Sequence, residues 1–374
     1  MLNLLNVITA GTSIFLAFLV FTVRRDTNTL ANRWLAAFLL LVGLFILDDS
    51  LVVYGIYQRH PWVYGYFSLP NFALAPALYL TVSQFVSVER RFRKKDLWHF
   101  SLFFLFTLLS LPFLFAPKAV KLAEIAKISE PLGLADYIFL SVLVIQILSY
   151  LFFSFRKLKR HQKNMERITA SPTEFNLNWL LYFLYGVMGL TFIWFCELFF
   201  QPLQTDASGY TLGYLVAIYC LGYFALRQKE VFPFSQKEAE AVGEMLDDTK
   251  ALPSERRLIF DEEKRNELKT KLLQKMETER PYLDAELNLP KLAKLMDLSV
   301  HEMSELVNEG FGENFAQFVN RYRVEESKQL LFSEKHAHLN MVGIAFEAGF
   351  NSKTAFNTAF KKQVGMTPSE FQKL

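Results

Sequence analysis

Hydrophobic residues dominate the chain up to about residue 227, and they are interspersed with charged residues after it. In the first part, seven stretches approach the roughly 20 mainly apolar residues that a membrane-spanning helix needs. In the second part, apolar residues recur three and four positions apart, which is the spacing of one face of a helix. The pattern predicts an all-α protein with a seven-transmembrane-helix domain at 1–226, a linker at 227–262 and a helical domain at 263–374. The seven stretches are 4–23, 34–57, 62–86, 97–115, 135–155, 179–200 and 210–226.

Lysine and arginine are distributed unequally between alternate loops of the membrane domain. Sixteen of them follow the first, third, fifth and seventh stretches, whereas the other loops hold only four. Because cytoplasmic loops carry the excess of basic residues, we expect the N-terminus outside and the C-terminal domain in the cytoplasm. The first stretch is followed by Arg24 and Arg25 rather than by a small-residue cleavage pattern, so we expect it to be retained.

Polar residues interrupt several of the apolar stretches, and the candidates for a site are Asp48, Asp49, Asn71 and Glu197. Charged side chains are costly at membrane depth, so such residues are candidates for function. One interpretation makes them the polar floor of a pocket for an unknown small-molecule or envelope cue. The alternative places them among the outer headgroups or at helix ends, where the cost is modest.

Two further segments show a helical spacing of apolar residues. Residues 116–128 predict a short helix on the outer membrane surface or, alternatively, a lid over a ligand. Residues 258–279 predict a charged helix that either packs on the following domain or pairs two protomers in a homodimer. The apolar face of this second helix consists of Leu268, Leu272, Leu273 and Met276.

Composition limits the chemistry of the chain. The net charge is only +3, so bulk electrostatics alone indicates no polyanionic partner. Cys196 and Cys220 both lie in apolar runs without metal-ligand spacing, and we expect them to be small buried hydrophobic residues. The sequence has no nucleotide-binding glycine loop and no recognisable Ser/His/Asp motif. We therefore expect no enzyme activity, no cofactor and no metal.

Two similar helix–turn–helix patterns follow in the last quarter of the chain. In the first, at 289–309, Ser299 is placed to cap a helix whose inner face carries Met303, Leu306 and Val307. In the second, at 341–363, Ser352 caps a helix that buries Ala355, Phe356, Ala359 and Phe360. An amphipathic helix at 314–331 connects the two units, and at 1.5 Å per residue it is about 27 Å long. The second helix of each pattern, held in this way, could enter one of two successive major grooves of a DNA duplex.

Three motifs in this region resemble the AraC-type DNA-binding domain. They are residues 320–331 (NRYRVEESKQLL), 344–352 (IAFEAGFNS) and 360–371 (FKKQVGMTPSEF). The resemblance implies a bipartite helical domain that binds double-stranded DNA and controls transcription. The seven-span arrangement resembles membrane-bound AraC-type regulators of Bacteroidota-like bacteria, which implies a multi-pass protein of the bacterial cytoplasmic membrane, in contact with the lipid bilayer.

The resemblance also implies positions that contact DNA. In the first unit the base-reading positions are His301, Ser304 and Glu305, which we expect to face outward. The full set of predicted DNA-contacting residues is Ser299, His301, Ser304, Glu305, Ser352, Lys353, Thr354, Asn357, Thr358 and Lys361.

Charge differs between the two units. Residues 262–320 hold 8 basic and 12 acidic residues, whereas residues 321–374 hold 8 basic and 5 acidic residues. Because contacts with phosphate supply much of the affinity for DNA, we expect the second unit and the connecting helix to dominate this binding.

Three functions are compatible with these patterns. In the first, the membrane domain senses an outer or intramembrane cue and changes the presentation of the DNA-binding domain. In the second, the spans are a passive anchor, although a single span would be enough for that. In the third, a transporter-like membrane domain is fused to an autoregulatory DNA-binding domain, although no paired short spans indicate a transport repeat.

Overall fold

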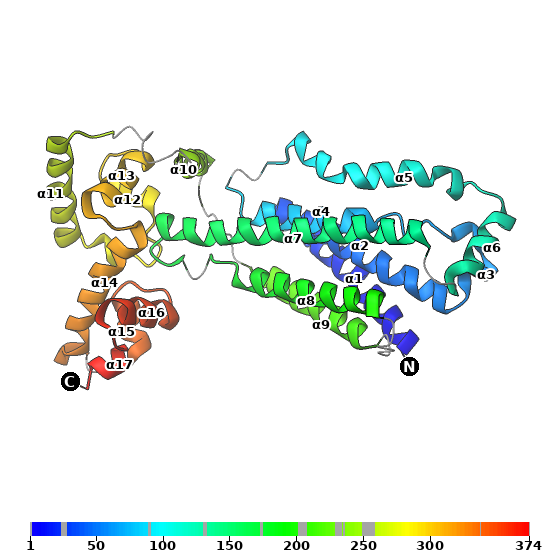
Figure 1. The fold of residues 1–374 in the computed structure, drawn as a ribbon. Helices are drawn as coiled ribbons and strands as arrows, with labels where there is room; N and C mark the ends of the chain where they lie inside the picture. Colours follow the sequence, from blue (N-terminus) through cyan, green and yellow to red (C-terminus); the bar gives the residue numbers. More distant parts are fainter. Residues whose placement is uncertain are drawn as a thin grey trace. The chain divides into compact units, whose positions relative to one another are not determined.

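A computed structural model describes residues 2–23, 28–88, 91–129, 133–172, 175–200, 208–228, 234, 236–248, 259–336 and 338–373. In these residues the secondary structure is helical, apart from one bridge between Thr169 and Asn288 (Figure 1). The chain divides into two compact units. The first contains residues 1–158 and 178–231, and the second contains 159–177 and 232–374.

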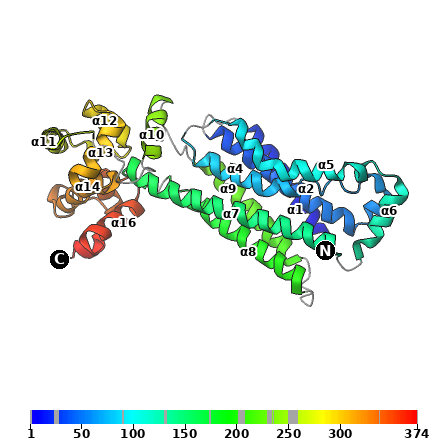
Figure 2. The same ribbon diagram turned by 45° about the horizontal axis from the view of Figure 1, so that its top comes forward.

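The first unit is a bundle of apolar helices. Helices α1 and α2 lie side by side along their length (Figure 1, Figure 2), α2 also packs against α4, and α9 packs against α1 and α8. Ser13 donates a hydrogen bond of 2.7 Å to the carbonyl of Leu39, which joins α1 to α2. The helices of this unit are α1 (Leu2–Thr22), α2 (Thr29–Val53), α3 (Ile56–Arg59), η1 (Pro61–Val63), α4 (Asn71–Phe85), η2 (Lys94–Phe100), α5 (Ser101–Leu114), α6 (Lys118–Ala126), η3 (Lys127–Ser129), the first part of α7 (Leu134–Ile168), α8 (Asn178–Phe200) and α9 (Ser208–Arg227).

Five of the described helical segments are long and apolar enough to cross a membrane, rather than the seven that the sequence predicts. The third predicted stretch, 62–86, is α-helical only in the 15-residue α4, which at 1.5 Å per residue spans about 22 Å of the roughly 30 Å hydrocarbon layer. Gly65, at φ +94°, and Pro70 precede this helix in a run of turns and keep it short. The seventh stretch forms a shorter apolar helix, Thr211–Arg227.

Two smaller expectations about the first unit have different outcomes. Residues 118–126 form the predicted short helix, α6, and its Lys121 is buried and donates to the carbonyl of Trp62 at 3.1 Å. The expectation that both cysteines are buried is wrong, because Cys196 is half-buried and Cys220 is exposed.

The second unit contains the C-terminal helices and the end of α7. Helix α7 runs to Ile168, well beyond the predicted 135–155, and its last turns bury His161, Met165 and Ile168 at helical spacing. Helix α11 buries Leu268, Leu272 and Met276 and packs against α13, as in the first of the two interpretations of that helix. The helices of this unit are α10 (Gln236–Asp248), α11 (Glu262–Thr278), η6 (Pro281–Leu283), α12 (Leu289–Leu295), α13 (Val300–Phe311), α14 (Phe315–Leu331), η7 (Glu334–His336), α15 (Met341–Glu347), α16 (Lys353–Val364) and α17 (Pro368–Phe371).

Candidate nucleic-acid interface and helix-bundle cavity

Helices α12 and α13 form the first helix–turn–helix unit. The chain turns at Asp297, whose φ of 57° is left-handed, and the N–H of Leu298 donates to the carbonyl of Ala293 at 2.9 Å. This bond, from a residue five positions along the chain, closes a Schellman-type end of α12. Ser299 then begins α13 with a capping box. Its hydroxyl accepts from the N–H of Glu302 at 3.2 Å, and the Glu302 carboxylate accepts from the N–H of Ser299 at 2.7 Å.

Helices α15 and α16 repeat this arrangement. Gly349 takes the left-handed position at φ +86°, and the N–H of Phe350 donates to the carbonyl of Ala345 at 2.9 Å. The hydroxyl of Ser352 accepts from the N–H of Ala355 at 3.2 Å and caps α16, as predicted. The inner face of α16 buries Phe356 and Phe360 completely. The two units therefore share a left-handed residue at the start of the turn and a serine cap at its end, although the second turn is one residue longer.

Helix α14 connects the two units and begins at Phe315, one residue after its cap, Asn314. Its Arg323 is fully buried and donates to the carbonyls of Tyr282 at 2.7 Å and Asp284 at 2.8 Å. A third bond of 3.4 Å runs to the hydroxyl of Ser171, in the segment that follows α7. Burial lowers the pKa of Arg323 to about 10, so the guanidinium stays charged at neutral pH and holds three segments together.

The predicted DNA-contacting residues of α16 lie on its outer side. Lys353, Thr354, Thr358 and Lys361 are exposed, and Asn357 is half-buried. An ammonium group thus stands near each end of the helix, with hydroxyl and amide groups between them. Such an arrangement can contact phosphates at the ends and base edges in the middle.

The first helix–turn–helix unit presents its outer side differently. Ser304 and Glu305, which we predicted to face outward, are covered, because Ser304 is only 8% exposed and the Glu305 side chain only 11%. The Glu305 carboxylate accepts from the backbone N–H groups of Ile259 at 2.8 Å and Phe260 at 3.1 Å. His301 is half-buried.

Helix α10 packs against α13 in this part of the structure. It buries Val242, Met245 and Leu246, which are spaced as one face of a helix. Residues 236–248 lie in the segment predicted as a linker, 227–262, although this spacing is typical of a helix that docks on another surface.

Comparison with known protein families matches residues 292–374 to a family described as helix-turn-helix domain. This part of the chain is a helix-turn-helix domain. The match covers most of α12 and all of α13 to α17, and it supports a DNA-binding transcription regulator of AraC type. Neither the curated proteins nor the solved structures contain a match to the chain.

Of the four candidate pocket residues, the three whose side chains the structure describes, Asp48, Asp49 and Asn71, do not surround one cavity. Asp48 accepts a hydrogen bond from the hydroxyl of Tyr57, and Asp49 accepts from the amide of Asn6 at 2.9 Å. Asn6 in turn accepts from Thr211 at 2.6 Å, so this network ties α1 to α2 and α9. The side chain of Glu197 lies outside the described residues.

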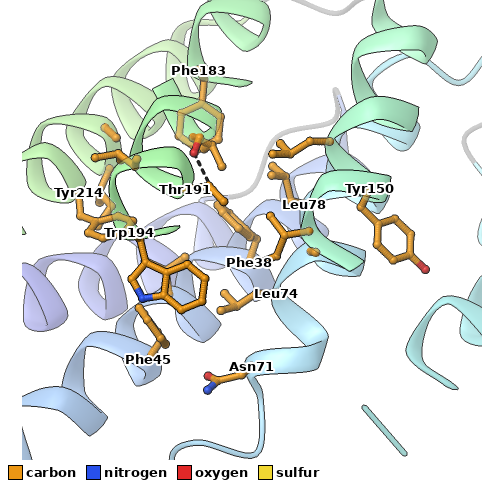
Figure 3. A pocket seen from close by; sticks show the side chains of 18 of the residues that line it. Phe38, Phe45, Asn71, Leu74, Leu78, Tyr150, Phe183, Thr191, Trp194 and Tyr214 are labelled. Atoms are coloured by element: carbon orange, nitrogen blue, oxygen red, sulfur yellow. Dashed lines mark hydrogen bonds between the residues drawn. The ribbon is translucent and has the colours of Figure 1, made fainter. Parts of the chain in front are cut away.

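Asn71 instead lies at one end of a separate cavity of about 140 Å³ (Figure 3). Helices α2, α4, α7, α8 and α9 contribute its lining, which is apolar and, in the described residues, includes no charged side chain. In the described part of the chain the carboxamide oxygen of Asn71 is buried without a hydrogen-bond partner. The hydroxyl of Thr191 donates to the carbonyl of Val187 at 2.8 Å. The described lining thus offers an apolar volume with the unpartnered Asn71 oxygen at its end.

Proposed function

We propose that this protein is a membrane-anchored, sequence-specific DNA-binding transcription regulator that couples an outer or intramembrane cue to transcription. One observation carries the DNA-binding part. Two helix–turn–helix units, each with a left-handed residue in its turn and a serine cap, are joined by the single helix α14, within the region matched to the helix-turn-helix domain family. Helices held in this way can enter successive major grooves.

The membrane part of the proposal is supported by the five long apolar helices and by the unequal loops. Sixteen basic residues follow alternate apolar stretches, and this asymmetry favours a cytoplasmic C-terminal domain. The DNA-binding domain would then act at the inner face of a bacterial cytoplasmic membrane.

Selection from random double-stranded DNA, with the full-length protein in lipid nanodiscs, tests the DNA-binding part. We expect one sequence class to be enriched, and we expect the Asn357→Ala variant to lose its preference at one or two base pairs. Unselective recovery of DNA by the unmodified protein would contradict a sequence-specific regulator.

Replacement of residues 1–226 by one inert membrane-spanning helix separates sensing from passive anchoring. A sensor loses its response to the inducing condition, although the protein stays at the membrane. A response retained at full amplitude would mean that the spans serve only as an anchor.

The cavity at Asn71 indicates the chemistry of a cue. A carboxylate or ammonium would be buried among apolar side chains at a large cost, so we propose a neutral, hydrocarbon-rich ligand. A cavity of this size resembles those that bind benzene-sized molecules. A hydroxyl or amide donor on the ligand would satisfy the Asn71 oxygen.

Quenching of Trp194, which lines the cavity, tests this ligand class. We expect 4-bromobenzyl alcohol to quench the fluorescence saturably in the full-length protein, and the Trp194→Phe variant to lose this component. Asn71→Leu should weaken binding of the alcohol but not of bromobenzene, because only the alcohol donates to the carboxamide. Quenching that rises linearly and equally for both compounds would contradict the proposal.

A further inference from the structure

Helix α10 has the surface of a helix that docks on another. Val242 is completely buried, and Met245 and Leu246 are 2% and 8% exposed. An isolated helix of 13 residues is marginal in water, so its stability depends on the surface that it covers. That surface is α13, the second helix of the first helix–turn–helix unit (Figure 1).

The chain that follows α10 is also fixed on α13. Glu305 holds the N–H groups of Ile259 and Phe260, and the guanidinium of Arg265 lies 4.0 Å from the same carboxylate. With 3.6 residues per turn, Glu305 lies on the side of α13 opposite Met303 and Val307, which face the domain core. The side of α13 that would face DNA is therefore occupied by the protein itself.

The dimensions of DNA make this occupation exclusive. The major groove is about 12 Å wide, and a helix with its side chains is already about 10–12 Å across. A helix whose outer side is bonded to residues 259–260, and which also packs against α10, cannot enter the groove. We propose that α10, together with Ile259 and Phe260, is an autoinhibitory cover that keeps the first unit off DNA until it is released.

This inference rests on the proposed DNA-binding function and adds a means of control to it. Only eight residues separate the end of α9 from the start of α10. Helix α10 is therefore the first helix along the chain on which a movement of α9 would act. A cue regulates the first unit if it favours the arrangement of the membrane helices that goes with a released α10. The apparent affinity for DNA then rises in proportion to the fraction of protein molecules in which α10 is released from α13.

Thiol labelling of the full-length protein tests the cover without DNA. In a background of Cys196→Ser and Cys220→Ser, the Ser304→Cys variant reports access to α13, and Glu309→Cys, at an exposed position, serves as reference. Val242→Asn and, independently, Met245→Asn loosen α10 without adding charge, and Glu244→Ala on its exposed side is the control. We expect the two Asn variants to raise maleimide labelling at position 304 about tenfold relative to position 309.

Affinity for a selected double-stranded DNA completes the test. We expect both Asn variants, without the added cysteine, to bind about tenfold more tightly than the unmodified protein, and Glu244→Ala to bind equally. Unchanged labelling at position 304 in both Asn variants overturns the cover. Increased labelling with unchanged affinity overturns its inhibitory role. If labelling rises but no form binds any DNA selectively, the proposed function fails while the cover stands.

Discussion

The two helix–turn–helix units share a left-handed turn residue and a serine cap but differ in what surrounds their second helices. In the first unit, Ser304 is buried and Glu305 is bonded to the backbone of residues 259–260. In the second unit, Lys353, Thr354 and Lys361 are exposed. Local sequence thus determines the turn and the cap of each unit, whereas segments outside the motif determine which of the two second helices is exposed.

Charge reinforces this difference. The half with the covered helix is acidic, and the half with the exposed helix is basic. Since contacts with phosphate do not depend on base sequence, the second unit can hold DNA before the first unit reads it. Under the proposed function, α16 would therefore anchor the protein on DNA and α13 would be the controlled reader.

A substitution in the turn of the second helix–turn–helix unit has the largest expected effect, which is on the free energy of unfolding. A Cβ at Gly349 would lie 2.3 Å from the carbonyl oxygen of Tyr282, and the φ of +86° adds strain. We expect Gly349→Ala to lower the free energy of unfolding of the second helix–turn–helix unit by about 3 kcal/mol or more. Hydrogen exchange of α16 measures this change.

Two matched substitutions separate the effect of backbone strain at a positive φ from the effect of a steric clash between the added Cβ and Tyr282. Asp297→Gly, at the equivalent position of the first unit, should change stability by less than about 1 kcal/mol. Gly365→Ala has a similar φ of +87° but open space around its Cβ, so it should cost only about 1–2 kcal/mol. Equal losses for Gly349→Ala and Gly365→Ala would show that contact with Tyr282 is unimportant.

A second comparison concerns affinity for DNA. We expect Lys353→Ala with Lys361→Ala to weaken binding at least about tenfold and to reduce the salt slope by about 2, because two phosphate contacts are lost. Titrations of selected DNA at several salt concentrations measure both quantities. The charge-matched pair Lys264→Ala with Lys271→Ala, on the exposed side of α11, should change affinity much less. Equal effects of the two pairs would refute the dominance of the second unit.

The caps provide the smallest expected effect. Ser352→Ala and Ser299→Ala each remove a hydroxyl that accepts one backbone N–H, so each should cost about 1 kcal/mol. We expect exchange of the first-turn amide protons to accelerate about fivefold in the affected helix and to stay unchanged in the other helix. A loss of DNA affinity without faster exchange would mean that these hydroxyls contact DNA rather than stabilise the helices.

Sequence predicted the features that depend on neighbouring residues. Ser299, Ser352 and the limits of α14 were predictable because a cap and an apolar face lie within a few residues of each other. The cover on α13 was not, because its contacts join residues more than 40 positions apart, such as Ile259 and Glu305.

In the compact unit of apolar helices, residues 1–158 and 178–231, other features depended on the path of the chain rather than on composition. The stretch 62–86 is apolar enough to span a membrane, but its Gly65 and Pro70 lie in turns before α4. Asp48 and Asp49 were identified as polar residues in an apolar helix, but their partners, Tyr57 and Asn6, lie on other helices and became visible only in the structure.

Hydroxyl-radical footprinting of the full-length protein on a selected DNA site tests the central difference most directly. We predict protection of the sugar–phosphate backbone along a single segment of the site by the unmodified protein, because only α16 is available. We predict a second protected segment, about one helical turn away, in the Val242→Asn variant. Two protected segments of equal strength in the unmodified protein would contradict the inequality of the two units.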